Sequence, residues 1–547
     1  MTARSKSLLC AGAVLVASTM ALAQDVTYER LLNPDKEPQN WLTFSGSYLG
    51  RRYSLLNQIT PDNVKNLEVK WVFQGQTLQR IEATPLVVDG VMYVVQAPND
   101  VLALDAVTGR VYWMYQYRLS ATSSGPCCGL NNRGLAILGS TLYMGTIDGH
   151  LVAIDAKTGH QLWDVQIADN ASFYSLTEAP LVVKDKILIG VAGAERGIRG
   201  FVGAYAADSG REVWKAYTIP GPGEPGFDSW PGDTWKRGGG SSWTTGSYDP
   251  ELNLVIWGTG NPWPDTDPEM REGDNLYTDS AIALDADTGK MKWYFQFTPN
   301  DGADWDSSQV PVLAEMRVNG AQRKVVYWAN RNGFFYVLDR ATGKFIRGNA
   351  FVKQNWATGL DENGRPVRVP NMRASVAGTL TFPGSQGGTN WFSPSYSTHT
   401  GLFYVSAWED YGAVFSKGVQ PHDGGRGSGL PRSTMPTITR GPMNTWTETI
   451  AHGEVKAIDP TTGQQKWAFK MNDVTDAGVL TTASDVLFTG NREGFFFVLD
   501  ARNGNLLWKL NTGGQVSSTP ITFSVNGKQY VSMSCGHSVF VFGLREQ

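Results

Sequence analysis

Apolar and polar residues alternate along this chain in short segments that recur with one signature. The unit reads apolar-x-Asp-x-x-Thr-Gly-x-x-x-Trp, with full copies at Ala103–Trp113, Ala153–Trp163, Ala283–Trp293 and Ala457–Trp467. Weaker copies at Ala204–Trp214, Val337–Arg347 and Val498–Trp508 bring the set to seven. Because alternation flanks a turn in each copy, the pattern predicts a strand, a tight turn and a second strand.

Each repeat also carries the chemistry of a turn and of a sheet contact. The Asp and Thr side chains can accept hydrogen bonds from turn amides, and the Gly tolerates positive φ. The closing Trp combines a large apolar ring with one N–H donor, which suits docking between neighbouring sheets. Another strand pair precedes each repeat, as in Thr84–Gln96 and Ala179–Ala192. Four strands per unit, repeated around an axis, predict a β-propeller.

The spacing of the repeats sets the number of blades. The long gap between Gly343 and Gly463 has room for an unmarked blade around GLFYVSAW, Gly401–Trp408. A strand near Val69–Phe73 can complete a blade with C-terminal strands near Gln529–Gly536, which closes the ring. We therefore predict an all-β fold, an eight-bladed β-propeller, with seven blades as the alternative.

The N-terminus indicates export. Basic residues at Arg4 and Lys6 precede an apolar run, Leu8–Leu22, and an A-x-A cleavage motif. We predict a signal peptide at residues 1–23 and one propeller domain at 24–547, located in the periplasm, with a retained membrane anchor as the alternative. Disulfides persist in such a compartment.

Charge and histidine content exclude two function classes. Loss of the two basic residues takes the formal charge from −4 to −6, which argues against nucleic-acid binding. The 6 histidines are scattered without ligand spacing, which argues against zinc. A propeller alone still leaves function open, because the scaffold hosts enzymes and binding modules alike.

The repeats, together with the loop SGPCCGLNNRG at Ser124–Gly134, identify a resemblance. From Asn40–Trp71 to Val516–Gly536 the chain resembles the pyrroloquinoline quinone (PQQ)-dependent alcohol dehydrogenases, which include methanol and ethanol dehydrogenases. The resemblance implies a periplasmic enzyme that oxidises alcohols by hydride transfer to metal-bound PQQ.

The resemblance also accounts for the adjacent cysteines. It implies that Cys127 and Cys128 form a disulfide packed on one face of the planar quinone, with Trp243 on the other face. Ordinary thiols or an intermolecular bridge are the alternatives. Cys535 has no evident partner, and we expect a buried free thiol there.

Cations and donors around the quinone follow from the same resemblance. Arg133 matches an arginine near a PQQ carboxylate, Arg331 matches the residue beside the quinone oxygens, and Glu82 matches a glutamate that accepts from the cofactor. Further rim contacts are implied at Thr177, Gly193, Ala194, Ser241, Asn390 and Trp391. Each residue alone reads equally as a surface or turn residue.

Hard oxygen donors indicate a metal site. Glu195, Asn261, Asp304 and Asp306 offer carboxylate and amide oxygens, which suit Ca²⁺ or a similar hard cation. The resemblance makes the first three metal ligands and Asp304 the general base, which removes the alcohol proton. The alternative for Asp304 is a turn-capping role.

Asp306 bears on the choice of ion. Calcium members of the resembled family usually have a small neutral residue at this place, whereas lanthanide members carry a second Asp. An added carboxylate offsets the charge of a trivalent ion. We favour a lanthanide-capable site. The alternative is Ca²⁺ with Asp306 pointing to solvent.

Partners and substrate follow less directly. Because the sequence contains no C-x-x-C-H haem motif, a soluble periplasmic cytochrome c is the implied electron acceptor. We expect no membrane anchor, and a monomer or a homodimer. The alternatives are a dehydrogenase for sugars or bulky secondary alcohols, and a non-catalytic propeller scaffold.

Two segments are expected to shape the substrate lid. They are the insertion Gly418–Pro442 and the segment Asp473–Gly478, while the insertion Pro220–Gly240 decorates a face. Relatives often carry a tryptophan just before the AGVLTT stretch, where this chain has Thr475 and Asp476. Loss of that bulk predicts a pocket open to larger alcohols.

Overall fold

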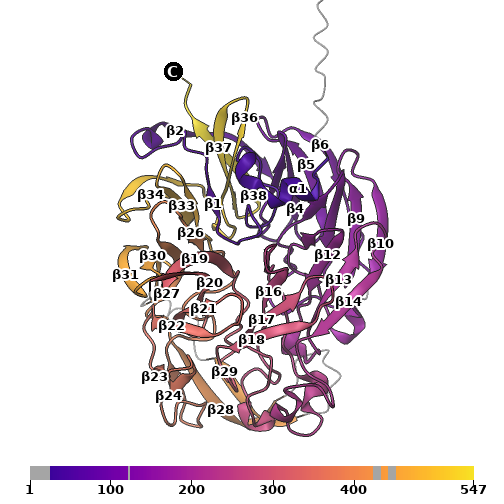
Figure 1. Ribbon diagram of the computed structural model, residues 1–547, viewed down its shortest axis with the longest axis vertical. Coiled ribbons are helices and arrows are strands. Elements are labelled where there is room, and N and C mark those ends of the chain that lie inside the picture. Colours follow the sequence, from indigo (N-terminus) through magenta and orange to yellow (C-terminus); the bar gives the residue numbers. More distant parts are fainter. Residues whose placement is uncertain (1–24, 121–122, 319, 423–432, 441–450, 547) are drawn as a thin grey trace, which may run out of the picture.

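Eight antiparallel sheets surround a common axis (Figure 1). This computed structural model describes residues 25–120, 123–318, 320–422, 433–440 and 451–546, and the side chains of 417–450 are not part of the description. The predicted signal peptide therefore lies outside the described residues. The prediction of an eight-bladed propeller is confirmed, and the seven-bladed alternative is wrong.

The blades follow one another along the chain. Blades 1 to 4 comprise β3 (Leu86–Val88), β4 (Val91–Gln96), β5 (Asp100–Asp105), β6 (Val111–Tyr115); β7 (Ala136–Leu138), β8 (Thr141–Gly145), β9 (His150–Asp155), β10 (Gln161–Gln166); β11 (Leu181–Val183), β12 (Lys186–Gly190), β13 (Phe201–Ala206), β14 (Glu212–Tyr217); and β15 (Ser247–Asp249), β16 (Leu254–Gly258), β17 (Ser280–Asp285), β18 (Met291–Gln296).

Blades 5 to 8 complete the ring. They comprise β19 (Val312–Val318), β20 (Ala321–Ala329), β21 (Phe334–Asp339), β22 (Phe345–Ala350); β26 (Ser395–Tyr396), β27 (Phe403–Glu409), β30 (His452–Asp459), β31 (Gln464–Lys470); β32 (Leu480–Thr482), β33 (Val486–Gly490), β34 (Phe495–Asp500), β35 (Leu506–Asn511); and β36 (Ile521–Val525), β37 (Lys528–Cys535), β38 (Ser538–Leu544) with β2 (Leu67–Gln74). A short strand, β1 (Tyr53–Ser54), adds to blade 7 in parallel with β32.

The described helices are short; α1 and η1 precede the first strand, and the others lie between strands. They are α1 (Tyr28–Leu32) and seven 3₁₀ turns, η1 (Pro34–Lys36), η2 (Val64–Asn66), η3 (Asn170–Ser172), η4 (Ala194–Arg196), η5 (Phe227–Ser229), η6 (Thr234–Arg237) and η7 (Pro268–Arg271). No helix in the described ranges is long and apolar enough to cross a membrane.

The eighth blade is assembled from both ends of the chain. The N-terminal strand β2 pairs antiparallel with β38, with Trp71 opposite Val541 and Phe73 opposite Val539. The predicted closure of the ring is therefore confirmed.

One expectation needs correction. The stretch Gly401–Trp408 is not an unmarked blade of its own, because its strand β27 pairs with β30 of the repeat at Ala457–Trp467. An insertion separates these two strands in sequence, and that insertion lengthened the gap between repeats. The seven repeats thus mark seven blades, and the closing blade is the eighth.

The repeat tryptophans hold the blades together, as predicted. The indole N–H groups of five tryptophans donate to a carbonyl of the next blade at 3.1–3.2 Å: Trp71 to Ala106, Trp113 to Ala156, Trp214 to Ala286, Trp293 to Arg340 and Trp467 to Ala501. Each ring also covers the repeat glycine of that blade. A Cβ built on Gly159 would lie 2.6 Å from the Trp113 ring, so only glycine permits this contact.

The interface between blades 5 and 6 has an arginine in place of the indole. Blade 5 carries Arg347 where the other repeats carry Trp, and its guanidinium donates to the Thr461 carbonyl of blade 6. The side chain of Asn349 covers Gly463 there instead of an indole ring.

The order of strands separates turns from functional loops. In an antiparallel blade, the connections after the second and fourth strands lie at one end, and those after the first and third lie at the other. The Asp-Thr-Gly turns follow third strands, and Asp105 accepts from the amides of Val107 and Thr108 at 2.9 and 2.8 Å. The opposite face is left for loops without the repeat.

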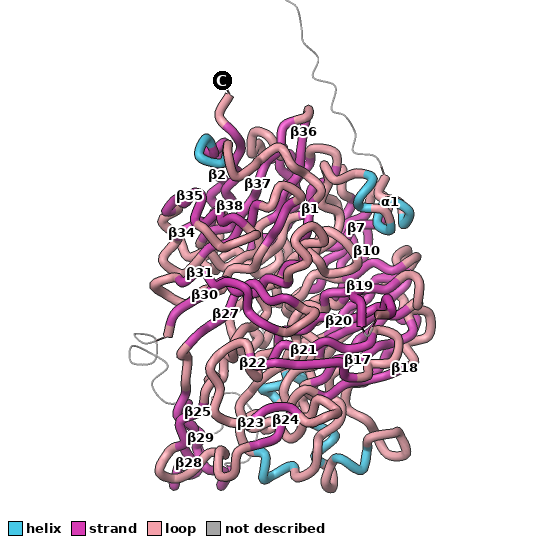
Figure 2. The backbone as a smooth tube through the Cα atoms, turned by 60° about the vertical axis from the view of Figure 1, so that its left-hand side comes forward, coloured by secondary structure: helices cyan, strands magenta, loops and turns pink. Residues whose placement is uncertain are grey.

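An excursion extends one edge of the propeller. It consists of the two-stranded sheet β23 (Ala357–Leu360) and β24 (Pro366–Arg368), and of the sheet β25 (Thr379–Thr381), β28 (Ala413–His422) and β29 (Ser433–Arg440). Figure 2 shows these strands at the end of the molecule remote from β36. Part of the predicted lid insertion Gly418–Pro442 forms β28 and β29, and the rest lies outside the described residues, so the lid role stays a prediction.

Candidate active site

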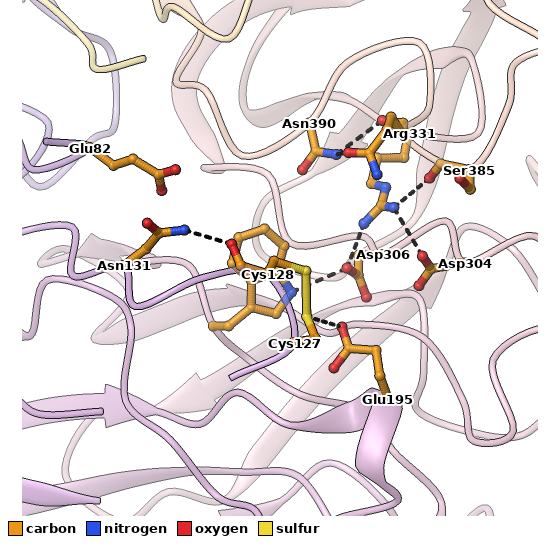
Figure 3. Close-up of a disulfide and its surroundings, with 12 residues drawn as sticks. Glu82, Cys127, Cys128, Asn131, Glu195, Asp304, Asp306, Arg331, Ser385 and Asn390 are labelled. Carbon is orange, nitrogen blue, oxygen red and sulfur yellow. Dashed lines mark hydrogen bonds and ion pairs between the residues drawn. A yellow bond between two sulfur atoms is a disulfide. The ribbon is translucent and has the colours of Figure 1, made fainter. Parts of the chain in front are cut away.

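The predicted site residues lie at the end of the propeller opposite the Asp-Thr-Gly turns. Figure 3 shows the disulfide with Glu82, Glu195, Asp304, Asp306, Arg331 and Asn390 around it. They lie on connections after fourth or second strands, which converge on the propeller axis. Connections after fourth strands supply the disulfide loop (β6–β7), Thr177 (β10–β11), Trp243 (β14–β15) and Asp304 (β18–β19). Connections after second strands supply Glu195, Asn261 and Arg331.

The adjacent cysteines are joined. Cys127 and Cys128 form a disulfide with a Cα–Cα distance of 3.8 Å, so the prediction is confirmed and the alternative of separate thiols is wrong. The Sγ of Cys127 lies 3.3 Å from Oε1 of Glu195, and the Asn131 side chain donates to the Cys128 carbonyl at 3.0 Å. Cys535 is a buried free thiol, as predicted, and burial raises its pKa to about 12.

Two tryptophans and an arginine form an aromatic layer near the disulfide. The Arg133 guanidinium lies 4.9 Å from the ring centre of Trp243 and 4.6 Å from that of Trp391. Its Nη2 forms an ion pair of 2.9 Å with Oε2 of Glu82, and both side chains are buried. Arg133 also donates to the Thr177 carbonyl. This layer offers a flat surface and a fixed cation, the two features that an aromatic carboxylate ligand requires.

Three carboxylates form the other half of the site. One oxygen each of Glu195, Asp304 and Asp306 lie within 4.8 Å of one another. Burial, followed by repulsion from Asp306, raises the pKa of Glu195 to about 7. Negative charges gathered at this spacing favour a bound cation, because it would relieve both the burial and the repulsion.

A fourth oxygen donor is available beside them. The backbone N–H of Asn261 donates to Oδ1 of Asp306 at 2.6 Å, which fixes the two residues side by side. The Oδ1 of Asn261 is buried and has no hydrogen-bond partner among the described residues. Such an orphaned amide oxygen beside three carboxylates fits a hard cation and does not fit a soft one.

Asp306 points into the site. Its side chain is 3% exposed and receives hydrogen bonds from Arg331 Nη1 at 2.5 Å and Trp243 Nε1 at 3.2 Å. The alternative of a solvent-facing Asp306 is therefore wrong. Because Asp306 accepts from Trp243 and is one of the three clustered carboxylates, it links the two halves of the site.

The turn next to Asp304 is capped by a different residue, Asp301. Asp301 accepts from the amides of Ala303 at 3.0 Å and Trp305 at 2.9 Å, so it caps this turn. Asp304 adopts a left-handed backbone conformation, φ +64°, and its Oδ2 lies 3.6 Å from Nη2 of Arg331. Because Asp301 caps the turn, the Asp304 side chain can point toward Glu195 and Asp306.

The remaining predicted residues lie around these two halves. Gly193 has φ +123° and, with Ala194, starts the turn η4 that carries Glu195. The Ser241 carbonyl accepts from the Gly260 amide at 2.6 Å, next to Asn261. Asn390 accepts from the Trp391 amide at 2.8 Å and donates to the Gln386 carbonyl. The structure thus brings together every residue predicted for the site.

Sequence reasoning missed a set of charges at the edge of the site. Arg80 contacts Glu82 and Asp476, and Arg492 forms an ion pair of 3.0 Å with Asp476. At this position the sequence suggested only the loss of a bulky tryptophan. The ion pair between Arg80 and Asp476 joins residues 396 positions apart, and no local pattern announces it.

Fold and site together define a class of β-propeller dehydrogenases. A family model described as glucose/ethanol/alcohol dehydrogenase, β-propeller domain, with the short name PQQ, matches residues 41–348. A second model, described as outer membrane protein assembly factor BamB, matches residues 451–537. The chain belongs to the PQQ-dependent, or quinoprotein, alcohol dehydrogenase family, and it is an oxidoreductase.

Relatives match over nearly the whole chain. The quinoprotein alcohol dehydrogenase PedH of Pseudomonas putida is 38% identical, over 95% of this chain and 91% of its own. A lanthanide-dependent methanol dehydrogenase of Methylacidiphilum fumariolicum is 36% identical, over 98% and 90%. Among solved structures, a europium-containing methanol dehydrogenase superposes with a TM-score of 0.87 at 33% identity, over 94% of this chain and 100% of that one.

Proposed function

We propose that this protein is a periplasmic quinoprotein that oxidises alcohols to aldehydes or ketones and passes the electrons to a separate soluble cytochrome c. The observation that carries the proposal is the convergence of Glu195, Asp304 and Asp306 beside the disulfide and Trp243. When bound, PQQ supplies a hydride acceptor and the metal ion a Lewis acid.

The chain's own residues supply binding, orientation and the proton acceptor. The disulfide and Trp243 offer the faces for a planar ring, while Arg133 and Arg331 offer cations for its carboxylates and oxygens. Glu195, Asn261, Asp304 and Asp306 would hold the metal.

Asp304 would take the hydroxyl proton of the alcohol while a hydride leaves the carbinol carbon, so the substrate loses one proton and one hydride. Arg331, at 3.6 Å, stabilises the charged form that this base requires. The burial of Asp304 limits competing water.

The donor set favours a trivalent ion. Three carboxylates and an amide oxygen carry three negative charges, and Arg331 is the counter-charge that the described part of the chain places against Asp304 and Asp306. A divalent ion and Arg331 together balance these three charges, and a trivalent ion also offsets part of the negative charge that a tricarboxylate cofactor adds. The printed names of two relatives, lanthanide-dependent and europium-containing methanol dehydrogenase, support this choice.

Substrate, acceptor and location are inferred from the relatives' names and from the sequence. The names of the relatives support an alcohol, with sugars and bulky secondary alcohols as rivals. A cytochrome partner is supported by the lack of a C-x-x-C-H motif in this sequence, and the periplasm by the N-terminal pattern. A homodimer stays a prediction.

The test starts from mature protein prepared without cofactor. PQQ would be added with Ca²⁺ or La³⁺, and alcohol-dependent reduction of an artificial dye would be followed. We expect activity that requires both PQQ and a metal, and that is higher with La³⁺. Absence of PQQ binding and of dye reduction with either ion, across small and bulky alcohols, would favour the scaffold alternative.

A further inference from the structure

A polar cavity of about 740 Å³ adjoins the disulfide on the side of the closing blade. It lies between the segment after β2, the loop that carries Cys128 and Asn131, the β35–β36 connection and the β37–β38 turn, all at the same end of the propeller as the candidate active site. Its charged and polar lining is formed by Gln74, Gln79, Arg80, Asn131, Thr512, Gln515, His537 and Ser538. An aliphatic ligand would find few partners there, whereas an anionic or strongly hydrogen-bonding group would find many.

Arg80 is the guanidinium that lines this cavity. It donates through Nε to Oε1 of Glu82 at 3.1 Å, and its Nη1 lies 3.5 Å from Oδ2 of Asp476. Among the described residues its Nη2 has no hydrogen-bond partner, and the side chain is 37% exposed. Arg80 therefore keeps donor capacity for a ligand while two carboxylates fix its position.

The carboxylates beside Arg80 are already paired with other arginines. Glu82 forms its second ion pair with Arg133, and Asp476 binds Arg492 through both oxygens, at 3.0 and 3.2 Å. Three guanidinium groups thus surround two carboxylates, and each carboxylate that contacts Arg80 is also paired with another arginine. Because these side chains are partly buried, dissolved salt screens their charges less than it screens those of exposed side chains.

Asp476 connects the arginines of this cluster to the cavity lining. Its side chain is 7% exposed and also accepts from the amide of Gln515 at 2.7 Å, another lining residue. Arg492 is held in turn by the ring of Trp408, whose centre lies 4.7 Å away. The donors at the cavity wall are therefore preorganised, which lowers the entropy lost on binding.

We infer that this cavity is a carboxylate-binding site, with Arg80 as the residue that binds the carboxylate. The inference rests on the proposed function and adds a site outside the set that holds the quinone and the metal. Two kinds of small molecule could bring the carboxylate there. One is PQQ, a tricarboxylate, on its way into the site, and the other is a substrate alcohol that carries a carboxylate at its far end.

The first arm of the experiment follows PQQ itself. Metal-loaded protein without cofactor would be mixed with PQQ in a stopped-flow instrument, and the quenching of tryptophan fluorescence would give the association rate. If PQQ supplies the carboxylate, Arg80→Gln slows association about tenfold and reduces its salt dependence, whereas Arg80→Lys keeps most of the rate.

The second arm follows the substrate. The holoenzyme would be assayed with a straight-chain ω-hydroxycarboxylate and with the matching ω-hydroxyamide. If the substrate supplies the carboxylate, Arg80→Gln lowers kcat/KM for the acid about tenfold relative to the amide. Arg502→Gln, which removes an arginine paired with Asp500 on an outer turn, is the matched control and changes neither readout.

Asp476→Asn guards against a purely structural effect. It removes a negative charge next to Arg80, so the affected readout should move in the direction opposite to Arg80→Gln. The inference is overturned if Arg80→Gln leaves both readouts unchanged, or if both variants weaken the same readout. A wild-type chain that neither binds PQQ nor oxidises any alcohol would instead overturn the proposed function.

Discussion

The blade interfaces and the active site are built from opposite kinds of sequence. At the interfaces one arrangement recurs, an indole that covers a glycine and donates to the next blade, as with Trp113 and Gly159. In the active site each residue is used once and comes from a different loop, as with Glu195, Asn261 and Asp304. The contrast teaches that the scaffold and the chemistry are carried by separate residues, so each can be changed without the other.

Asp304→Asn should break the chemistry and leave the scaffold intact. Asparagine keeps an oxygen for the metal but cannot take a proton, so we expect alcohol-dependent dye reduction to fall about 10³-fold. Thermal unfolding should stay close to that of wild type. The comparison variant is Asp301→Asn, which alters the residue that caps the turn and should lower the Tm. If the two variants lost the same activity and the same Tm, the loss in Asp304→Asn would come from the structure of the turn, which would contradict the role of Asp304 as the base.

Trp293→Ala should do the reverse. The variant removes a buried indole and its hydrogen bond to the Arg340 carbonyl, so we expect a loss of about 3 kcal/mol of unfolding free energy. The kcat of the folded enzyme should stay unchanged at a temperature well below the Tm. Arg347→Ala, at the equivalent position of the next repeat, should cost under about 1 kcal/mol. Equal losses for both variants would mean that the indole is not what stabilises the interface.

Asp306→Asn should show how the third carboxylate affects the choice between La³⁺ and Ca²⁺. One negative charge is lost beside Glu195 and Asp304, and a trivalent ion loses more attraction than a divalent one. We expect the ratio of La³⁺ affinity to Ca²⁺ affinity to fall about tenfold, measured by metal titration of dye reduction. Asp285→Asn makes the same chemical change in a repeat turn and serves as the control. An unchanged ratio would remove Asp306 from the metal site.

The smallest effect compares two repeat glycines. Gly343 has φ +70° and Gly463 φ +75°, so alanine has a similar backbone cost at both. The new Cβ would meet the rigid Trp293 ring at 2.5 Å in the first case and the movable amide of Asn349 in the second. Gly343→Ala should therefore lose about 1 kcal/mol more than Gly463→Ala in urea unfolding. The opposite order would show that the arginine interface is the tighter one.

The repeats made the fold predictable, because seven of the eight blades contain a signature that can be recognised within a dozen residues. The predicted turn of Ala103–Trp113, the Trp docking and the ring closure through Val69–Phe73 are all confirmed. The exception was the blade of Gly401–Trp408, where an insertion parted strands that pair in space. Pattern reasoning measures distance along the chain, so it placed an unmarked blade in a gap that one marked blade and its insertion fill.

The site was predictable only where a motif was already known. The adjacent cysteines and Asp306 came from such a motif, and the structure brings both to the expected place. Asp301 took the capping role that the sequence had left open for Asp304, because only the folded turn shows which carboxylate faces the amides. Arg80 and Asp476 were missed because ion pairs between distant loops leave no trace in spacing.

The closing blade has a consequence for how the chain matures. Because β2 lies near the N-terminus and pairs with β38 near the C-terminus, no partial chain can complete the ring. Until the last strand arrives, β2 exposes an unpaired edge, which invites aggregation. Synthesis and folding are thus coupled through the pairing of Leu67 with Leu544, 477 positions apart, and contacts at such a separation make folding slow. A C-terminal truncation that removes β38 should therefore lower solubility, although it removes no residue of the active site.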